Sequence, residues 1–120
     1  MITKQFFKAN VRYGNNGSAI LDLEGELTAP AQDELYTTYT EIEKQNPHTI
    51  LLNFSGIHYL NSTGIAMLIN LLMRARRANI ALMAYGLSRH YTELFQLAGL
   101  ASVLPILPEQ PAILLPVMVN

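Results

Sequence analysis

The pattern of apolar and polar positions changes along the chain, and its first part predicts two strands. Residues 5–13 and 18–23 are rich in strand-forming residues and flank the turn Gly14-Asn15-Asn16-Gly17. Gly and Asn accept the positive φ angles that a tight hairpin requires. The N-terminal part of the chain is therefore expected to form a β-hairpin.

Helical spacing follows the hairpin. Leu35, Tyr39 and Ile42 recur at the i, i+4, i+7 interval of one buried helix face. Thr28 can cap the start of this helix, and Pro47 marks its end. A first helix is expected between these two residues.

Strands and helices then alternate. Residues 49–54 are continuously apolar apart from Asn53, which indicates a strand covered on both faces, and residues 80–85 form a second strand of this kind. A helix is predicted from Ser62 to about Ala78. Another runs from a Ser88 cap to Leu97.

The C-terminal part is less regular. Gly99 suits the left-handed position that closes a helix. Residues 103–107 can form a short strand that Pro105 confines to an edge, and Pro111 can open a last short helix. The whole pattern predicts an α/β fold: a mixed sheet made of an N-terminal hairpin plus parallel strands, with about four helices. One domain is expected over residues 1–120, with a core at about 5–107 and a short helix or tail at 108–120.

Composition narrows the function classes. Half of the residues are apolar, 14% are charged and the formal net charge is −1, which argues for a globular protein and against a general nucleic-acid binder. There is no cysteine, so disulfides and thiolate metal sites are excluded. The N-terminus lacks a signal-peptide core, and no apolar run reaches the length of a membrane span. A cytoplasmic protein without membrane insertion is expected.

Catalytic and cofactor motifs are absent from the sequence. There is no phosphate-cradling glycine loop, and His48, His58 and His90 are scattered without metal-ligand spacing, so neither cofactor nor metal is expected. His58 lies four residues before Ser62, which raises the alternative of a small serine hydrolase. No G-x-S-x-G elbow surrounds Ser62 and no acidic third member is evident, so a non-enzymatic protein is the preferred interpretation.

The turn at residues 61–64, Asn-Ser-Thr-Gly, lies between a predicted buried strand and a predicted apolar helix. A helix start offers free backbone N–H groups and partial positive charge, which suit a phosphate. Ser62 is therefore a candidate phosphorylation site, whereas a simple helix cap is the ordinary alternative. Gly64 is expected to allow a close approach of the backbone at this turn, although a glycine merely tolerated in the first helical turn is nearly as plausible.

Three segments carry a family resemblance. Residues 23–28 (Leu-Glu-Gly-Glu-Leu-Thr), residues 61–64 and residues 94–100 (Leu-Phe-Gln-Leu-Ala-Gly-Leu) occur in this order over most of the chain. They resemble the Gly-Glu-Leu-Asp, Asp-Ser-Ser/Thr-Gly and Leu-Phe-x-x-x-Gly-Leu segments of the anti-sigma factor antagonists, bacterial members of the STAS family. Asn61 stands where the family usually has aspartate.

The resemblance implies a partner switch. It identifies Ser62 as the phosphate acceptor, with Thr63 as second choice, and an anti-sigma factor that is also a serine kinase as the partner, reset by a phosphatase. Phosphorylation is expected to block docking by adding charge and bulk to the binding surface. Alternatives are a STAS module that needs no phosphorylation, either a signalling scaffold or a subunit of a lipid-transport ABC complex.

The remaining partner-binding candidates come from the helix after Ser62 and from Glu26. Ile65, Leu68, Ile69 and Leu72 share one face and are expected in the core, whereas Met67, Leu71 and Met73 fall outside it. Methionine suits adaptable interfaces. Because the resemblance implies that partners dock around the start of this helix, docking is slightly favoured for these residues. The resemblance places Glu26 near the partner surface. The predicted partner-binding residues are Asn61, Ser62, Thr63, Gly64, Met67 and Glu26.

Charged residues are unevenly placed. Acidic residues crowd the segment 22–43, and Arg74, Arg76, Arg77 and Arg89 lie within a later stretch. Solvated helix faces are the preferred interpretation, and a bipolar surface that orients a partner is the alternative. The pattern leaves the oligomeric state open.

Overall fold

The computed structural model describes residues 6–14 and 16–108. Its backbone forms one five-stranded sheet with the strand order β1-β2-β3-β4-β5. The strands are β1 (Phe7–Tyr13), β2 (Ser18–Leu27), β3 (Thr49–Leu60), β4 (Ala81–Tyr85) and β5 (Ile106–Leu107). The β1–β2 hairpin is antiparallel and all other pairs are parallel, which confirms the mixed sheet that the pattern predicts.

Three α-helices and two 3-10 turns are found in the described part of the chain. They are η1 (Ala29–Ala31), α1 (Gln32–Glu43), α2 (Ser62–Arg77), α3 (Arg89–Leu97) and η2 (Leu100–Ser102). About four helices were expected, and this number is slightly too high for the described residues. The short helix predicted at Pro111 falls outside them.

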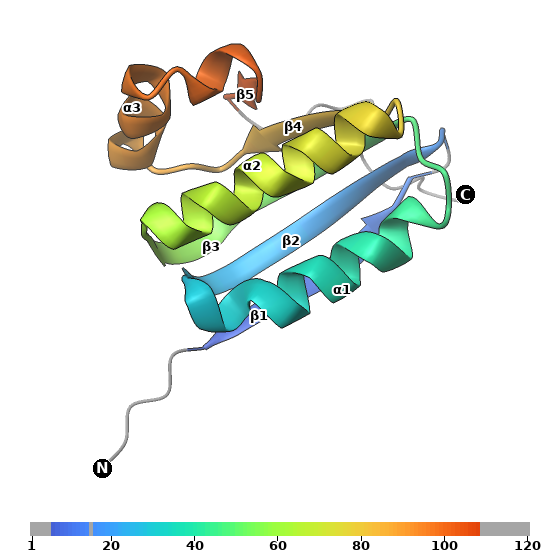
Figure 1. Cartoon of the computed structure of the whole chain (residues 1–120), viewed down its shortest axis with the longest axis horizontal. Helices are drawn as coiled ribbons and strands as arrows, with labels where there is room; N and C mark the ends of the chain where they lie inside the picture. The colour runs from blue at the N-terminus through green and yellow to red at the C-terminus, as the bar shows by residue number, and fades with distance from the viewer. Residues whose placement is uncertain (1–5, 15, 109–120) are drawn as a thin grey trace, which may run out of the picture.

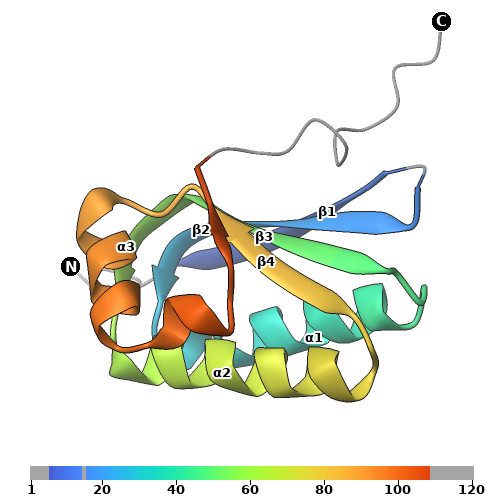
Figure 2. The ribbon, with the colours of Figure 1, turned by 90° about the horizontal axis from the view of Figure 1, so that it is seen from above.

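Both long helices lie on the same side of the sheet (Figures 1 and 2). Apolar side chains from that side of the strands, such as Leu21 and Leu52, pack against Leu35 of α1 and Leu68 of α2. These four side chains are fully buried. The core therefore lies between the sheet and the α1–α2 layer, and α3 with η2 lies beside α2 (Figure 1).

Aromatic contact fixes α3 to the sheet. The rings of Phe54 in β3 and Phe95 in α3 meet edge to face, with centroids 6.4 Å apart. Such pairs add to the stability given by the buried area alone. The sequence 94–100 therefore closes the domain next to the end of β3, the strand that leads to Ser62.

Several element bounds differ from the expected ones. β2 continues to Leu27 and β3 to Leu60, because irregularities near Gly25 and Gly56 let pairing resume after a register shift. Gly25 has φ +101°, a conformation that suits glycine. The longer β3 carries the chain directly to Asn61, so that the helix α2 begins where the central strand ends.

The buried face of α2 differs from the predicted stripe. Met67 and Leu71 are 2% and 0% exposed, whereas Ile69 is 42% exposed. The prediction that Ile69 faces the core is therefore wrong, and so is the placement of Met67 and Leu71 outside it. Because α2 is apolar on more than one side, its sequence alone could not select which side faces the sheet and α1.

Candidate functional site

The turn at residues 61–64 forms the N-terminus of α2. The side-chain carbonyl of Asn61 accepts a hydrogen bond from the backbone N–H of Gly64 at 3.0 Å, and the backbone N–H of Ile65 donates to the carbonyl of Asn61 at 3.0 Å. Asn61 is therefore the helix cap, and Ser62 is the first helical residue.

Ser62 and Thr63 are exposed. Their backbone N–H groups belong to the first helical turn, which has no preceding carbonyls to accept them. Phosphate oxygens on Ser62 would lie close to these donors and to the positive end of the helix dipole. The geometry makes both hydroxyl groups accessible for modification.

Gly64 is buried under a neighbouring strand. A Cβ at this position would overlap the carbonyl oxygen of Leu27 and lie 2.8 Å from Cδ1 of Leu60. Only glycine lets the start of α2 come this close to the end of β2 without displacing backbone. The predicted close approach is confirmed, and it brings the segment that contains Glu26 beside the turn.

A tyrosine holds the other side of the turn. The hydroxyl oxygen of Tyr91 in α3 accepts the backbone N–H of Leu60 at 3.0 Å. Ser88 caps α3 by accepting the N–H of Tyr91 at 3.3 Å, and this bond fixes the helical turn that carries the Tyr91 ring. Sequence analysis missed Tyr91, because no local signal links it to a strand 31 residues earlier.

Met67 does not lie on this surface. It is 2% exposed and packs in the core, which excludes direct contact between its side chain and a partner docked on the folded domain. Met73 is 48% exposed and lines an apolar groove of about 340 Å³ between α2 and η2, together with Ile65, Ile69 and Val103. The exposed apolar side of α2 thus includes Ile69, which sequence analysis assigned to the core, and Met73, which it placed outside the core. Leu68 and Leu72 of the predicted core stripe are buried, as expected.

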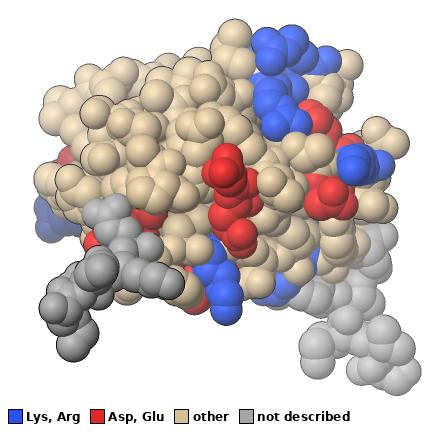
Figure 3. Space-filling model, turned by 60° about the horizontal axis from the view of Figure 1, so that its bottom comes forward, with Lys and Arg blue, Asp and Glu red and all other residues tan. Residues whose placement is uncertain are grey.

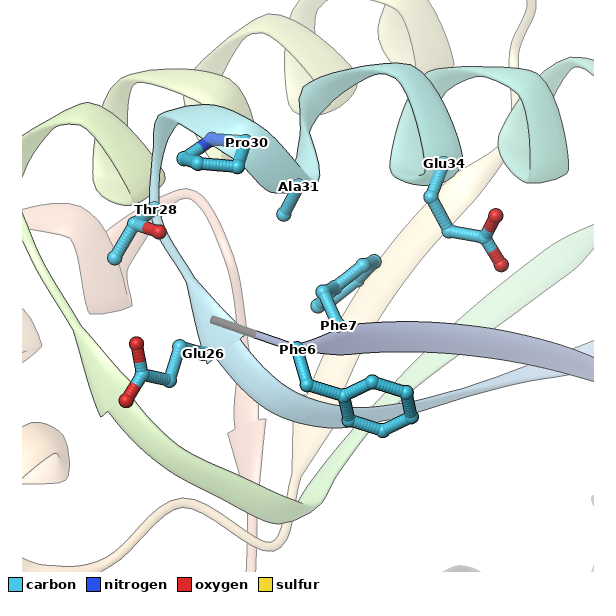
Figure 4. Close-up of a pocket in the computed structure, with 7 residues that line it drawn as sticks. All are labelled: Phe6, Phe7, Glu26, Thr28, Pro30, Ala31 and Glu34. Carbon is cyan, nitrogen blue, oxygen red and sulfur yellow. The ribbon is translucent and has the colours of Figure 1, made fainter. Parts of the chain in front are cut away.

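Glu26 lies near the turn on β2. It is half-buried and pairs across the β2–β3 ladder with Tyr59, which is 48% exposed. Glu26 also lines a hollow of about 390 Å³ with Phe6, Phe7 and Glu34. Figure 4 shows Phe7 between the two carboxylates. The turn and this hollow lie at the same end of the sheet, beyond the carboxyl ends of β2 and β3.

Charges are sparse around the start of α2. Its first turn holds no acidic residue, and its basic residues Arg74, Arg76 and Arg77 lie in the last turn. Figure 3 shows one group of basic side chains together at the upper right and others at separate places, with a broad uncharged expanse at the upper left. A phosphate on Ser62 would introduce charge into a largely uncharged surface.

The clustered charges are partly paired within the domain. Arg74 of α2 donates to Glu43 of α1 at 2.7 Å, and Arg89 lies 3.5 Å from Glu93 within α3. The acidic and basic segments thus meet across the α1–α2 contact. This arrangement agrees with solvated, locally paired helix faces.

Among the described residues, neither a Ser62–His58 pair nor a cluster of metal ligands is formed. In the described part of the chain no hydrogen bond joins Ser62 to His58, and no group of three or more potential metal ligands occurs. The described helices include none that is long and apolar enough to cross a membrane.

Comparison with known proteins defines the family. Residues 12–108 match the family model described as "Mlab, STAS domain". The chain therefore belongs to the STAS domain family, and the three segments that suggested it lie within the matched range.

Individual proteins similar to this chain include a transporter and anti-sigma factor antagonists. YvdB of Bacillus subtilis, described as a sulfate transporter, is 32% identical over 78 residues, which are 65% of this chain and only 15% of the transporter. An anti-sigma factor antagonist from Mycobacterium paratuberculosis has 15% identity and a TM-score of 0.77, with 91% of this chain and 92% of that chain covered. The phosphorylated form of the Bacillus cell fate determinant SpoIIAA has 18% identity and a TM-score of 0.65, with 84% and 92% covered. At these identities the two structures establish a shared fold.

Proposed function

We propose that this STAS domain is a non-enzymatic partner switch of the anti-sigma antagonist type, controlled by phosphorylation of Ser62. Its partner is an anti-sigma factor that is also a serine kinase, and a phosphatase resets it. The observation that carries this proposal is the exposed hydroxyl of Ser62 at the capped start of α2, on a surface with little charge. The resemblance of the fold to SpoIIAA, solved in both forms, supports the same interpretation.

The switch acts on docking and leaves the fold intact. In the unmodified state, Asn61, Ser62, Thr63 and Glu26 form part of a neutral to weakly acidic contact surface. A phosphoryl group adds about −1.5 to −2 charges at neutral pH. A partner that docks over it must desolvate that charge, which opposes binding unless the partner supplies a cation there. The phosphorylated form therefore releases the partner.

Asn61 changes one property of the site. Its carbonyl keeps the capping bond to Gly64 but carries no charge, so a phosphate on Ser62 meets no adjacent carboxylate. An aspartate at this position would repel the phosphate. The neutral cap lowers the electrostatic cost of the phosphorylated state. A kinase that requires the acidic residue would act poorly on this chain.

The direct experiment is peptide mass spectrometry of the chain isolated from its own cells across growth and stress conditions. We expect phosphate on Ser62, absent from a Ser62→Ala chain and retained in a Thr63→Ala chain. A partner captured by Ser62→Ala and released by Ser62→Asp would complete the cycle. Phosphate found only on Thr63 would move the acceptor by one residue.

A second candidate is a STAS module that works without phosphorylation, as a signalling scaffold or as a subunit of a lipid-transport ABC complex. The observation that favours it is the match to a small part of a transporter, combined with Asn61 at the position of the usual aspartate. A chain that stays unmodified in cells, and whose partner binds Ser62→Asp as well as wild type, would establish this alternative.

A further inference from the structure

A stripe of side chains runs along α2 from the candidate phosphorylation site to the last turn of the helix. Its members are Ser62, Ile65, Ile69, Leu72 and Arg76, which follow one another at alternating intervals of three and four residues. Side chains at this spacing share one helix face and form the seam along which two helices pair. Ser62, Ile69 and Arg76 are exposed and Ile65 is half-buried. The stripe is therefore open to solvent over most of its length.

The apolar groove between α2 and η2 borders this stripe. Ile65, Ile69 and Met73 line the groove from α2, and Leu100 and Val103 line it from the opposite side. Exposed apolar side chains gathered in one groove indicate a surface that binds another protein. The apolar part is short, because Ile65 and Met73 lie only about 12 Å apart along the helix axis. A standard interface buries about 800 Å² per partner, so this groove alone is too small to hold a stable dimer.

The two ends of the stripe differ in charge. Arg76 makes no ion pair or hydrogen bond with any of the described residues, whereas Arg74 on the same helix is paired with Glu43 at 2.7 Å. At the other end, the unmodified Ser62 is neutral and lies at the positive pole of the helix dipole. Ser62 and Arg76 are about 21 Å apart along the helix axis. Arg76 therefore cannot reach a phosphate on Ser62 of its own copy.

Ile69 is the midpoint of the stripe, because it lies seven residues from Ser62 and seven from Arg76. A second α2 can pack antiparallel on the stripe about a two-fold axis at Ile69. Arg76 of each copy then lies opposite Ser62 of the other, and Met73 of each copy lies opposite Ile65 of the other. Packed helix axes are about 8–10 Å apart, which long side chains bridge. A two-fold contact forms every such pair twice.

We propose that phosphorylation of Ser62 makes this stripe self-complementary, so that two phosphorylated copies pair through antiparallel α2 helices. This inference rests on the proposed function, in which Ser62 carries the phosphate. Arg76 of each copy donates charge-assisted hydrogen bonds to the phosphate of the other, a geometry that the guanidinium group suits. Ile69 meets its equivalent at the axis. Met73, whose side chain adapts to irregular surfaces, enters the groove of the other copy.

The charge on Ser62 decides whether the copies pair. Without phosphate, Arg76 and Arg77 of one copy approach the positive pole of the other α2, and this repulsion opposes the contact. A phosphoryl group brings about −1.5 to −2 charges to the same place and turns the repulsion into attraction. In the paired state the start of α2 is covered. A second copy therefore withholds the phosphorylated chain from its kinase partner, in addition to the effect of the phosphate itself.

The experiment measures dimer formation by the full chain with sedimentation equilibrium. Phosphoserine is inserted at position 62 during translation, so that the sample needs no kinase. We expect the dimer dissociation constant of the phosphorylated chain to be at least about tenfold lower than that of the unmodified chain. Arg76→Ser should abolish this difference. Arg89→Ser is the matched control, because it removes an exposed arginine from α3, and it should preserve the difference.

A mixed sample tests the antiparallel register. One chain carries phosphoserine at position 62 together with Arg76→Ser, and the other chain is unmodified and keeps Arg76. Neither chain has both halves of the pair, so neither should dimerise with itself beyond the level of the unmodified chain. The mixture should form a heterodimer, because the phosphate of one chain meets Arg76 of the other.

The opposite results are equally clear. A phosphorylated chain that dimerises no better than the unmodified chain would overturn the proposal and leave the groove to a different partner. A dimer that Arg76→Ser does not weaken, or a mixture without heterodimer, would overturn the register and with it the proposal. These outcomes do not depend on a cellular kinase. Absence of phosphate on Ser62 in cells would instead count against the proposed function, and the two failures are therefore distinguishable.

Discussion

The hydroxyl of Tyr91 accepts the backbone N–H of Leu60 at 3.0 Å and so ties α3 to the strand end that precedes Ser62. Leu60 is 4% exposed, and its amide has little access to water. The position of the Ser62 turn therefore depends on a residue 31 positions away, in a helix that carries none of the predicted site residues.

We predict that Tyr91→Phe loosens this turn without unfolding the domain. The change leaves a buried N–H without its acceptor, which costs about 1–3 kcal/mol. Hydrogen exchange should accelerate at Leu60 more than at the amides of the main core. Tyr59→Phe is the matched control, because Tyr59 is half-exposed and adjacent to the same bond. Unchanged exchange at Leu60 in Tyr91→Phe would contradict the role of the hydroxyl.

A Gly64→Ala variant is expected to be strongly destabilised. The added methyl group overlaps the carbonyl of Leu27, and backbone must move to admit it. Overpacking of this kind costs about 1–3 kcal/mol in the free energy of unfolding. Chemical denaturation measures it, with Thr63→Ala on the exposed side of the same turn as control. A Gly64→Ala midpoint equal to that of the control would show that α2 can shift at no cost.

Ser62→Asp is expected to fold as well as wild type. A negative charge in the first turn of α2 interacts favourably with the helix dipole, by about 0.3–1 kcal/mol at an exposed site. A thermal melt far below that of wild type would show that charge at this position damages the fold, and loss of partner binding could then not be assigned to the switch.

The main sequence signals that the structure confirms are local ones. Asn61 and Ser88 cap helices because a short polar side chain precedes an apolar periodic run, and Gly99 closes α3 with φ +75°. Close approach at Gly64 was also expected, although its partner, Leu27, lies 37 positions earlier. The strand–turn–helix unit that presents Ser62 was predictable because the helix caps and the turn residues are local signals.

Long-range relationships were not predictable from one sequence. Tyr91 follows the Ser88 cap, and nothing in its neighbourhood indicates that its hydroxyl bonds Leu60. The buried side of α2 was misassigned because Leu71 and Ile69 are equally apolar, and only the position of α1 and the sheet decides between them. Asp22 looked like a solvated acid, yet it bonds Arg12 across the hairpin.

The Asp22 carboxylate is expected to give the domain part of its acid sensitivity. Burial would raise the pKa of Asp22, but hydrogen bonds from Arg12 and Asn53 outweigh it and hold the pKa below its usual value. Because the folded-state pKa is depressed, the stabilisation is present above the unfolded-state pKa of about 3.9 and is lost as pH falls through the folded-state value. The free energy of unfolding, measured between pH 6 and about 2.5, should fall less in Asp22→Asn than in wild type. The control is Glu24→Gln, because Glu24 is exposed on the same strand, and its curve should follow that of wild type. Parallel curves for Asp22→Asn and wild type would sink this assignment.

Tyr39 offers the opposite case, in which removing a polar group should help. Its hydroxyl is buried without a hydrogen-bond partner among the described residues, while Arg74 lies over its ring at 4.8 Å. Burial raises the pKa of Tyr39 to about 12, and Glu43 adds to the shift while Arg74 opposes it. Tyr39→Phe keeps the ring and its contact with Arg74 and removes the unpaired hydroxyl, so we expect the free energy of unfolding at pH 7 to rise by about 1 kcal/mol.

The same variant carries a pH signature. Since the folded-state pKa of Tyr39 is raised, its contribution is complete below the unfolded-state pKa of about 10 and is lost as pH rises toward 12. The difference between Tyr39→Phe and wild type should therefore widen over this interval, while Tyr36→Phe, at the half-buried surface of α1, serves as the matched control. A Tyr39→Phe chain less stable than wild type at pH 7 would mean that the hydroxyl has a partner, such as a bound water, whose loss outweighs the relief of burial.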